Sequence, residues 1–239
     1  MNLLQAKRLN AGYGGFQILF DIDFMWGSKE IVVIVGPNGS GKSTLLKSVF
    51  GLTKIYSGTI DFDRDSLVGL APHEIARKGI AYLPQTENIF DPLKVRENLL
   101  MAGYVSQEGI DQRVSQSIET FPVLKGCINR KAGTLSGGER QMLAMAMALV
   151  REPKVILFDE PTANLAPKVA GEVLDKIIEL RDTLGITVVI VEQSPKRALE
   201  NGDKCHLLVG GKVAFAGRPE ELLSHEELAR LYLGIRTDN

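Results

Sequence analysis

Two kinds of apolar pattern divide this chain into two kinds of strand. The runs Ile31–Val35, 155–158 and Thr187–Val191 are almost wholly apolar, which is typical of parallel strands buried on both faces. Over residues 18–26 and 57–63, apolar residues alternate with mostly polar ones, as in strands with one exposed face. The pattern predicts an α/β fold with a mixed, mainly parallel core sheet and a small antiparallel β layer.

Helical spacing of apolar residues predicts the remaining elements. Over 95–104 and 110–121 the pattern is helical, and further helices are expected before Arg151 and over Pro167–Leu184. We therefore expect a single domain with a helical insertion. The expected boundaries are 1–239 for the domain, 1–87 and 132–239 for the core with its antiparallel layer, and 88–131 for the helical subdomain.

A glycine-rich loop follows the run Ile31–Val35 and precedes a helical pattern. It reads G-x-x-x-x-G-K-S and consists of Gly36, Pro37, Asn38, Gly39, Ser40, Gly41, Lys42 and Ser43, with Thr44 beside it. Glycines let successive N–H groups curl around a phosphate, and the helix adds its positive dipole end. The loop predicts a nucleoside triphosphate site, with Lys42 on phosphate oxygens and Ser43 on Mg²⁺. A glycine-rich turn with a chance lysine would lack the flanking strand and helix.

The expected nucleotide is ATP. GTPases usually read guanine with an Asn/Thr-Lys-x-Asp box, and the nearest candidate here, residues 53–56 (TKIY), lacks the aspartate.

Polar side chains stand where the predicted core strands end. Asp159 is expected to hold Mg²⁺, and Glu160 to orient and deprotonate the attacking water. Gln85 ends another short strand and could ligate Mg²⁺ or position water. Tyr13 could stack on adenine. A helix cap at Asp159 and ordinary turn positions for Gln85 and Tyr13 are the alternatives.

The segment Ser136-Gly137-Gly138-Glu139 precedes a helix rich in Ala, Met and Leu. Serine followed three residues later by glutamate is a capping box. Each glycine in a first helical turn costs roughly 1 kcal/mol relative to alanine, which capping does not explain. A backbone that must approach a phosphate would explain it. We therefore expect a dimer in which each ATP is covered by the Ser136 turn of the other subunit.

Composition excludes several classes of function. The chain has 239 residues, a formal net charge of -1 and no run of basic residues longer than two. Electrostatic binding of nucleic acid is therefore not expected. Its apolar runs are far shorter than the ~20 residues of a spanning helix, and no secretory leader is expected. Cys127 and Cys205 have no metal-ligand spacing and are expected to be reduced thiols.

With these motifs in order, the sequence resembles the ATP-binding subunits of ABC transporters. Residues 135–139 (LSGGE) match the ABC signature, 36–43 match Walker A and 155–160 match Walker B, while Gln85 fits the Q-loop and Tyr13 the A-loop. The resemblance covers essentially the whole chain. It implies the P-loop NTPase fold of the ABC ATPase type, with ATP and Mg²⁺ bound.

Within this family, the sequence is most similar to the ATPase subunits of branched-chain amino-acid importers and of the related urea and amide importers. Residues 134–143 (TLSGGERQML), 164–167 (NLAP) and 191–193 (VEQ) carry this finer resemblance. Ala166 replaces the usual D-loop aspartate, and Gln193 replaces the usual switch histidine. We expect Gln193 to be a neutral donor to the γ-phosphate.

The resemblance also implies partners and a location. Integral membrane permease subunits would dock a short helix near residues 85–98, and a related ATPase subunit or a second copy would complete the dimer. A substrate-binding protein would act indirectly, and the chain would lie at the cytoplasmic face of the membrane. An ABC ATPase acting on a non-membrane scaffold, as in iron–sulfur assembly, stays open. A small-molecule kinase would lack the Ser136 turn.

Overall fold

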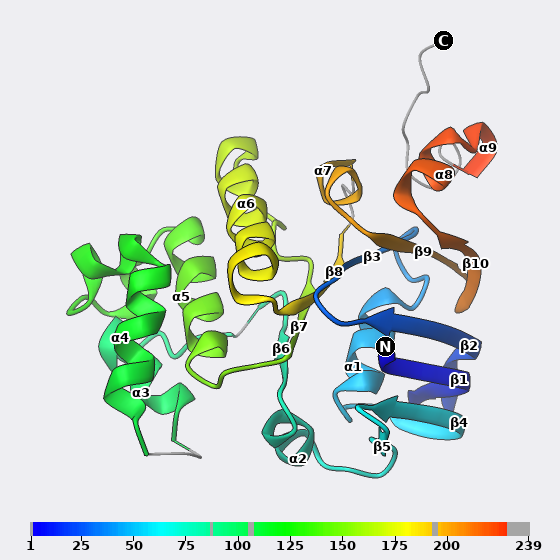
Figure 1. Cartoon of the computed structure of the whole chain (residues 1–239), viewed down its shortest axis with the longest axis horizontal. Helices are drawn as coiled ribbons and strands as arrows, with labels where there is room; N and C mark the ends of the chain where they lie inside the picture. The colour runs from blue at the N-terminus through cyan, green and yellow to red at the C-terminus, as the bar shows by residue number, and fades with distance from the viewer. Residues whose placement is uncertain (1, 87, 105–107, 193–195, 229–239) are drawn as a thin grey trace.

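Two β-sheets organise the protein (Figure 1). The computed structural model describes residues 2–86, 88–104, 108–192 and 196–228. The core sheet has the strand order β10-β9-β3-β8-β7-β6, and its strands are parallel except β10. They are β3 (Ile31–Val35), β6 (Ile80–Leu83), β7 (Val155–Asp159), β8 (Thr187–Val191), β9 (Lys204–Val209) and β10 (Lys212–Gly217).

The second sheet is antiparallel, with the order β2-β1-β4-β5. Its strands are β1 (Asn2–Tyr13), β2 (Phe16–Gly27), β4 (Lys54–Phe62) and β5 (Asp65–Ser66). From Ile22 to Trp26 inward residues are buried and the residues between them are exposed, as the alternating pattern predicts. The alternation is wrong before Ile22: Leu19 is buried and Phe20 is exposed, because β2 has a register shift at Asp21, whose φ is 48°. The predicted α/β fold with an antiparallel layer is therefore confirmed.

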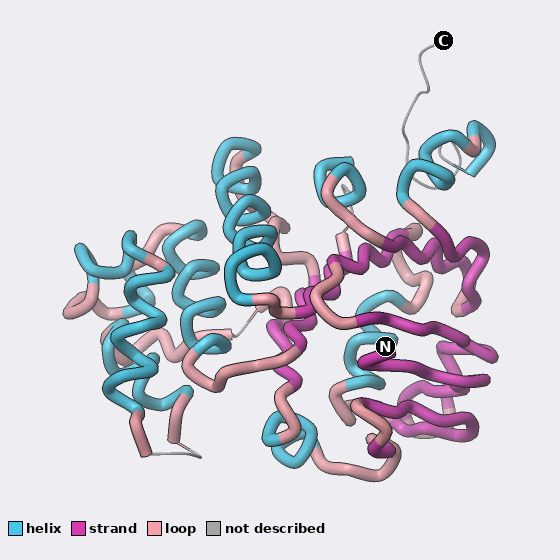
Figure 2. The backbone as a smooth tube through the Cα atoms, viewed as in Figure 1, coloured by secondary structure: helices cyan, strands magenta, loops and turns pink. Residues whose placement is uncertain are grey.

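Helix α1 (Lys42–Val49) lies between the two sheets (Figures 1 and 2). Its Leu45 and Leu46 share a core with Val32 and Ile34 of β3, whereas Val33 faces a second core on the other side of the sheet. Burial on both faces explains why the central strands are continuous apolar runs. The phosphate loop between β3 and α1 is thus held on a rigid support.

Most of the other helices cover the second core, whereas α2 packs its buried Ile75 into the core that contains α1. Helices α3 and α4 pack against α5, and α5 also packs on β6 and α6. The segment 88–131 is therefore joined to the core through α5. Helix bounds are α2 (Pro72–Arg77), α3 (Val95–Ala102), α4 (Ile110–Thr120), α5 (Gly137–Leu149), α6 (Pro167–Leu184), α7 (Lys196–Glu200), α8 (Pro219–Ser224) and α9 (Glu226–Leu228), with 3₁₀ turns at Pro122–Cys127 and Ala132–Thr134.

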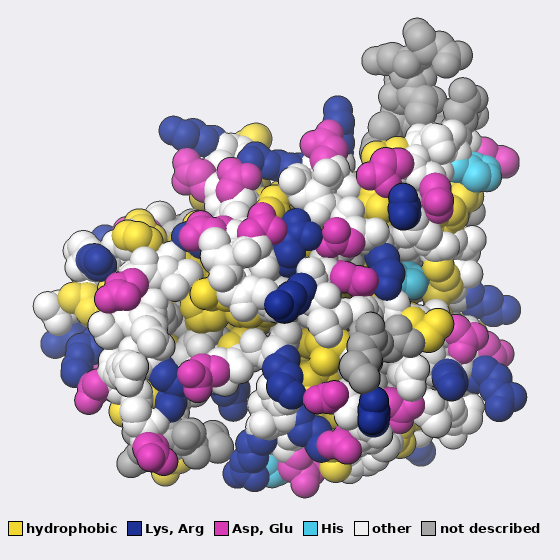
Figure 3. All heavy atoms as spheres, in the orientation of Figure 1, with side chains coloured by type: hydrophobic (Ala, Val, Ile, Leu, Met, Phe, Trp, Pro, Cys, Tyr) yellow, Lys and Arg dark blue, Asp and Glu magenta, His cyan; other side chains and the backbone are white. Residues whose placement is uncertain are grey.

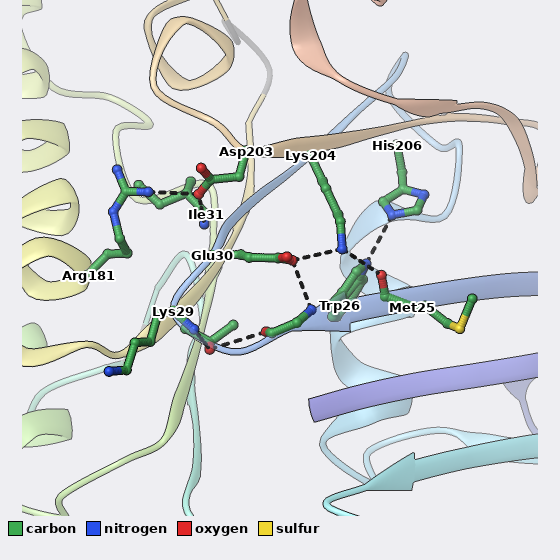
Figure 4. A network of polar contacts seen from close by, with 11 residues as sticks. Met25, Trp26, Lys29, Glu30, Ile31, Arg181, Asp203, Lys204 and His206 are labelled. Atoms are coloured by element: carbon green, nitrogen blue, oxygen red, sulfur yellow. Dashed lines mark hydrogen bonds and ion pairs between the residues drawn. The ribbon is translucent and has the colours of Figure 1, made fainter. Parts of the chain in front are cut away.

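A polar network ties the end of β2 to the start of β9 (Figure 4). Lys204 Nζ lies 2.9 Å from Glu30 Oε2, which also accepts the Gly27 N–H at 2.8 Å. The buried Trp26 indole donates to His206 Nε2 at 3.0 Å, and burial lowers the pKa of His206 to about 4. The antiparallel sheet is therefore fixed to the core sheet by groups that are neutral or paired.

The surface in Figure 3 mixes basic and acidic side chains over all elements in view. No helix in the part of the chain that the structure describes is long and apolar enough to cross a membrane.

Candidate active site

The phosphate loop leaves the carboxyl end of β3 in a conformation that requires glycine. Gly36, Gly39 and Gly41 have φ of 144°, 78° and 100°. Residues other than glycine rarely adopt such φ angles. Gly41 is the residue before α1, so the loop turns directly into the helix N-terminus. The result is a curl of N–H groups at a positive helix end, as expected for a phosphate site.

Lys42 lies inside this curl and is 5% exposed. Its Nζ donates to the carbonyl oxygens of Gly36 at 2.8 Å and Pro37 at 3.0 Å. Burial lowers the pKa of Lys42, and the carboxylates of Glu160 and Asp159 partly oppose this. The ammonium group is thus held where the loop closes, beside two acidic side chains.

Asp159, at the end of β7, connects the phosphate loop to β6. Its Oδ1 accepts from Ser43 Oγ at 2.7 Å, and its Oδ2 accepts from the Tyr82 hydroxyl at 3.0 Å. Burial, followed by the charge of Asp159, raises the pKa of Tyr82, so the phenol stays protonated and donates. Tyr82 was not predicted as a site residue. The sequence offers no signal for it, because its partner is 77 positions away.

The hydroxyl of Ser43 and the carboxylate of Asp159 are ligands that suit Mg²⁺. No cluster of three or more His, Cys, Asp or Glu side chains that could hold a metal occurs within the described ranges. One hydroxyl and one carboxylate leave most of the coordination of such an ion to phosphate and water.

Glu160 follows in a left-handed conformation, with φ of 52°. Its N–H donates to the Val191 carbonyl at 2.9 Å, and its Oε2 accepts from Gln85 Nε2 at 3.0 Å. The structure thus brings Gln85, Asp159, Glu160 and the phosphate loop together at the carboxyl ends of parallel strands, where such sheets place ligands. Gln193 lies outside the described residues.

The turn after Glu160, which we call the Glu160 turn (residues 160–166), is held from β8. Glu192 Oε1 accepts from the Thr162 hydroxyl at 2.8 Å and from its N–H at 3.2 Å. Asn164 has φ of 61°, so this short segment contains two left-handed non-glycine residues, the other being Glu160. Glu192 is 3% exposed and was not predicted as a site residue, although it directly follows the core strand β8.

Tyr13 is in the hairpin between β1 and β2, and its side chain is 43% exposed. The Tyr56 hydroxyl lies 3.0 Å from the Gly14 carbonyl oxygen and 3.2 Å from that of Phe16, which anchors this hairpin. Gly211 links β2 to the phosphate loop, because its N–H donates to the Ser40 carbonyl and its carbonyl accepts from Phe20 N–H. The hairpin that carries Tyr13 is therefore joined, through β2 and Gly211, to the phosphate loop.

The Ser136 turn (residues 135–139) forms the predicted capping box. Ser136 N–H donates to Glu139 Oε2 at 2.7 Å, and Glu139 N–H donates to Ser136 Oγ at 3.3 Å. The hydrogen bond from the Ser136 backbone lowers the pKa of Glu139. Helix α5 packs into the second core, on the opposite face of the sheet from α1 (Figure 1). The two capping hydrogen bonds of the Ser136 turn stay within the turn, and neither of them reaches the phosphate loop of the same chain.

Comparison with known proteins places this geometry in a family. The family model described as "ABC transporter" matches residues 19–163. The chain is 51% identical to a probable branched-chain amino acid transport ATP-binding protein LivF of Archaeoglobus fulgidus, over 98% of this chain and 99% of that protein. It is 37% identical to the high-affinity branched-chain amino acid transport ATP-binding protein BraG of Pseudomonas aeruginosa, over 97% and 100%. The ADP conformation of MJ1267, an ATP-binding cassette of an ABC transporter, superposes with a TM-score of 0.88 at 28% identity, covering 98% of this chain and 100% of that one.

Proposed function

The chain belongs to the ABC transporter family as an ATP-hydrolysing subunit, and from this premise we propose that it powers the import of branched-chain amino acids. Two relatives whose names specify branched-chain amino acid transport match it along nearly their whole length. The observation that carries the ATPase assignment is the 2.7 Å contact between Ser43 of the phosphate loop and Asp159 of β7, with Glu160 next in sequence.

In the proposed mechanism, the polar groups of the site bind the phosphates, hold Mg²⁺ or activate water, and Gln85 contributes to the last two. Lys42 holds the phosphate oxygens, and the N–H groups of residues 36–44 cradle the triphosphate. Ser43, Asp159 and Gln85 would hold Mg²⁺, which neutralises developing charge on the phosphates when bound. Glu160 accepts a proton from the attacking water, and its hydrogen bond with Gln85 orients the carboxylate. Tyr13 stacks on adenine.

Gln193 completes this site as a neutral donor to the γ-phosphate. Its amide can donate the hydrogen bond of a histidine but cannot take up a proton. Losing one aligned donor costs roughly 10²–10³ in rate. We expect Gln193→Ala to lose turnover, and Gln193→His to restore it with a new acid limb near pH ~6.5. An alanine variant with parental turnover would remove this role.

ABC ATPase subunits dimerise and work with membrane permeases. In the proposed dimer, the Ser136 turn of one subunit, with Ser136, Gly137, Gly138 and Glu139, covers the ATP bound by the other. The partner is a related ATPase subunit or a second copy. The permease contacts the helical subdomain, proposed as residues 88–131, near residues 85–98, at the cytoplasmic face of the membrane. A substrate-binding protein delivers the solute.

The experiment is reconstitution of the chain with its co-purifying membrane subunits in vesicles. ATP-dependent uptake of radiolabelled leucine, abolished by Lys42→Ala, is the expected result. Uptake of urea or short amides instead would assign the related importer class. Co-purification with an iron–sulfur scaffold, and no membrane subunit, would overturn the transport proposal while leaving the ATPase assignment intact.

A further inference from the structure

The glycines of the Ser136 turn form a notch that two side chains of the same subunit fill. A Cβ placed on Gly138 would lie 2.6 Å from Val169 Cγ1, and one on Gly137 would lie 2.8 Å from Leu165 Cδ2. No other heavy atom outside the turn's immediate surroundings comes within 4 Å of either position in the described chain. Neither glycine has a positive φ, so crowding, rather than backbone conformation, excludes a side chain here.

The two contacts differ in stiffness. Leu165 Cδ2 is the end of a flexible side chain and can rotate away at small cost. Val169 is β-branched and lies in the first turn of α6, where a single χ1 rotamer dominates. An added Cβ at position 138 therefore meets a side chain with little freedom to rotate away, whereas one at position 137 meets a flexible side-chain end.

Leu165 belongs to the Glu160 turn, and backbone hydrogen bonds join it to Glu160. Leu165 N–H donates to the Thr162 carbonyl at 3.2 Å, and Ala163 N–H donates to the Glu160 carbonyl at 3.1 Å. Thr162 is itself held by Glu192 at 2.8 Å. An unbroken set of bonds and packing contacts thus runs from Glu160 to Gly137 and Gly138.

We propose that Leu165 and Val169 are positioning residues that set the Ser136 turn relative to Glu160 of the same subunit. The inference rests on the proposed function, in which this turn covers the partner's ATP. Glycine at position 138 is required by this intrachain contact, not only by an approaching phosphate.

The test combines Gly138→Ala with variants of Val169. In the full chain without nucleotide, Gly138→Ala is expected to lower Tm by about 2–5 °C, although alanine is the better helix former. In the complex with the membrane subunits, its kcat should fall about tenfold with the KM for ATP little changed. Val169→Ala in the same chain makes room for the added Cβ, so it should restore Tm and raise kcat severalfold above that of Gly138→Ala alone.

Val169→Thr is the matched control, because it keeps the branch and the clash. Gly138→Ala with Val169→Thr should stay impaired, and Gly137→Ala alone should be milder than Gly138→Ala. A Tm that rises in Gly138→Ala, or a Tm and kcat that Val169→Ala does not raise above those of Gly138→Ala alone, overturns the inference. The Tm measurement needs no ATPase activity, so it separates failure of this inference from failure of the proposed function.

Discussion

The phosphate loop and the Ser136 turn both place glycines at the start of a helix, for different physical reasons. In the phosphate loop, Gly39 has φ of 78° and nothing within 4 Å of the position of a Cβ, so only its backbone conformation requires glycine. In the Ser136 turn, Gly138 is helical and has Val169 at 2.6 Å from that position. The first requirement is local, and no second substitution relieves it. The second depends on a neighbour and can be relieved there.

A basic side chain in the phosphate loop should matter more for ATP hydrolysis than one beside the Ser136 turn. Lys42→Ala therefore gives the largest expected effect. Lys42 is buried inside the loop, so its removal should abolish measurable ATP hydrolysis and weaken ATP binding. The check is steady-state phosphate release together with nucleotide binding by the full chain.

Two basic residues serve as controls for that change. Lys47→Ala, on the same helix, and Arg130→Ala, 3.4 Å from Glu139 beside the other turn, should each keep most of the activity. If Lys42→Ala hydrolyses ATP at a near-parental rate, the phosphate-loop assignment is wrong.

The phosphate loop and the Ser136 turn each have a glutamate nearby, Glu160 and Glu139, whose effects on turnover can be compared. Glu160→Gln should lower turnover by roughly 10²–10⁴ and keep ATP binding, because an amide cannot accept the proton of water. Glu139→Gln should change turnover only a few-fold, since its amide oxygen can still accept the Ser136 N–H. Single-turnover hydrolysis and size-exclusion with ATP and Mg²⁺ test both. Equal losses in the two variants would contradict this division of roles.

Gly39→Ala addresses the conformational requirement directly. A left-handed backbone costs a non-glycine residue about 1–2 kcal/mol, so ATP affinity should fall about tenfold. Because nothing surrounds the new methyl group, no substitution at a neighbour should rescue it. Gly126→Ala, exposed and without a positive φ, is the control and should bind ATP normally. Affinity can be measured with a fluorescent ATP analogue, and unchanged binding by Gly39→Ala would mean that the loop tolerates another conformation.

The local features of the molecule were predictable from the sequence. The bounds of β3, β8 and α6 follow from apolar runs, from periodicity and from a proline at the first helical position. Among the site residues, the phosphate loop, Asp159 and the Ser136 capping box depend on residues adjacent in sequence, so their local geometry was also accessible.

Features that depend on distant contacts were not predictable. Tyr82 reaches Asp159 across 77 positions, and Val169 reaches Gly138 only once α5 and α6 pack. The glycines of the Ser136 turn were attributed to a phosphate alone, because the sequence contains no record of what packs beside them. Helix α7 was not predicted, since five residues are too few to show a helical period.

Ser136→Ala should have a small effect, which is on the stability of the fold rather than on ATP hydrolysis. The substitution removes the side chain that accepts the Glu139 N–H, and losing an N-cap typically costs about 1 kcal/mol. Thermal unfolding of the full chain without nucleotide should show Tm lower by about 2–4 °C. Ser136→Asp retains an acceptor and should restore it. A Tm equal to the parent's would mean that the capping box does not stabilise α5.

The smallest expected effect concerns the pH dependence of the same capping box. The Ser136 N–H donates to Glu139 Oε2 at 2.7 Å and holds the pKa of Glu139 below its usual range. A carboxylate whose pKa is depressed by folding stabilises the folded state above its unfolded-state pKa, and this contribution is lost as pH falls through the folded-state pKa. Glu139→Gln keeps the acceptor but does not titrate. The parent should therefore exceed Glu139→Gln in Tm at neutral pH, and the difference should shrink as the pH falls below the usual carboxyl range and through the lowered pKa of Glu139. A difference that persists in acid would assign the effect to packing of Glu139 rather than to its charge, and would leave the Ser136 turn, like its glycine notch, determined by contacts alone.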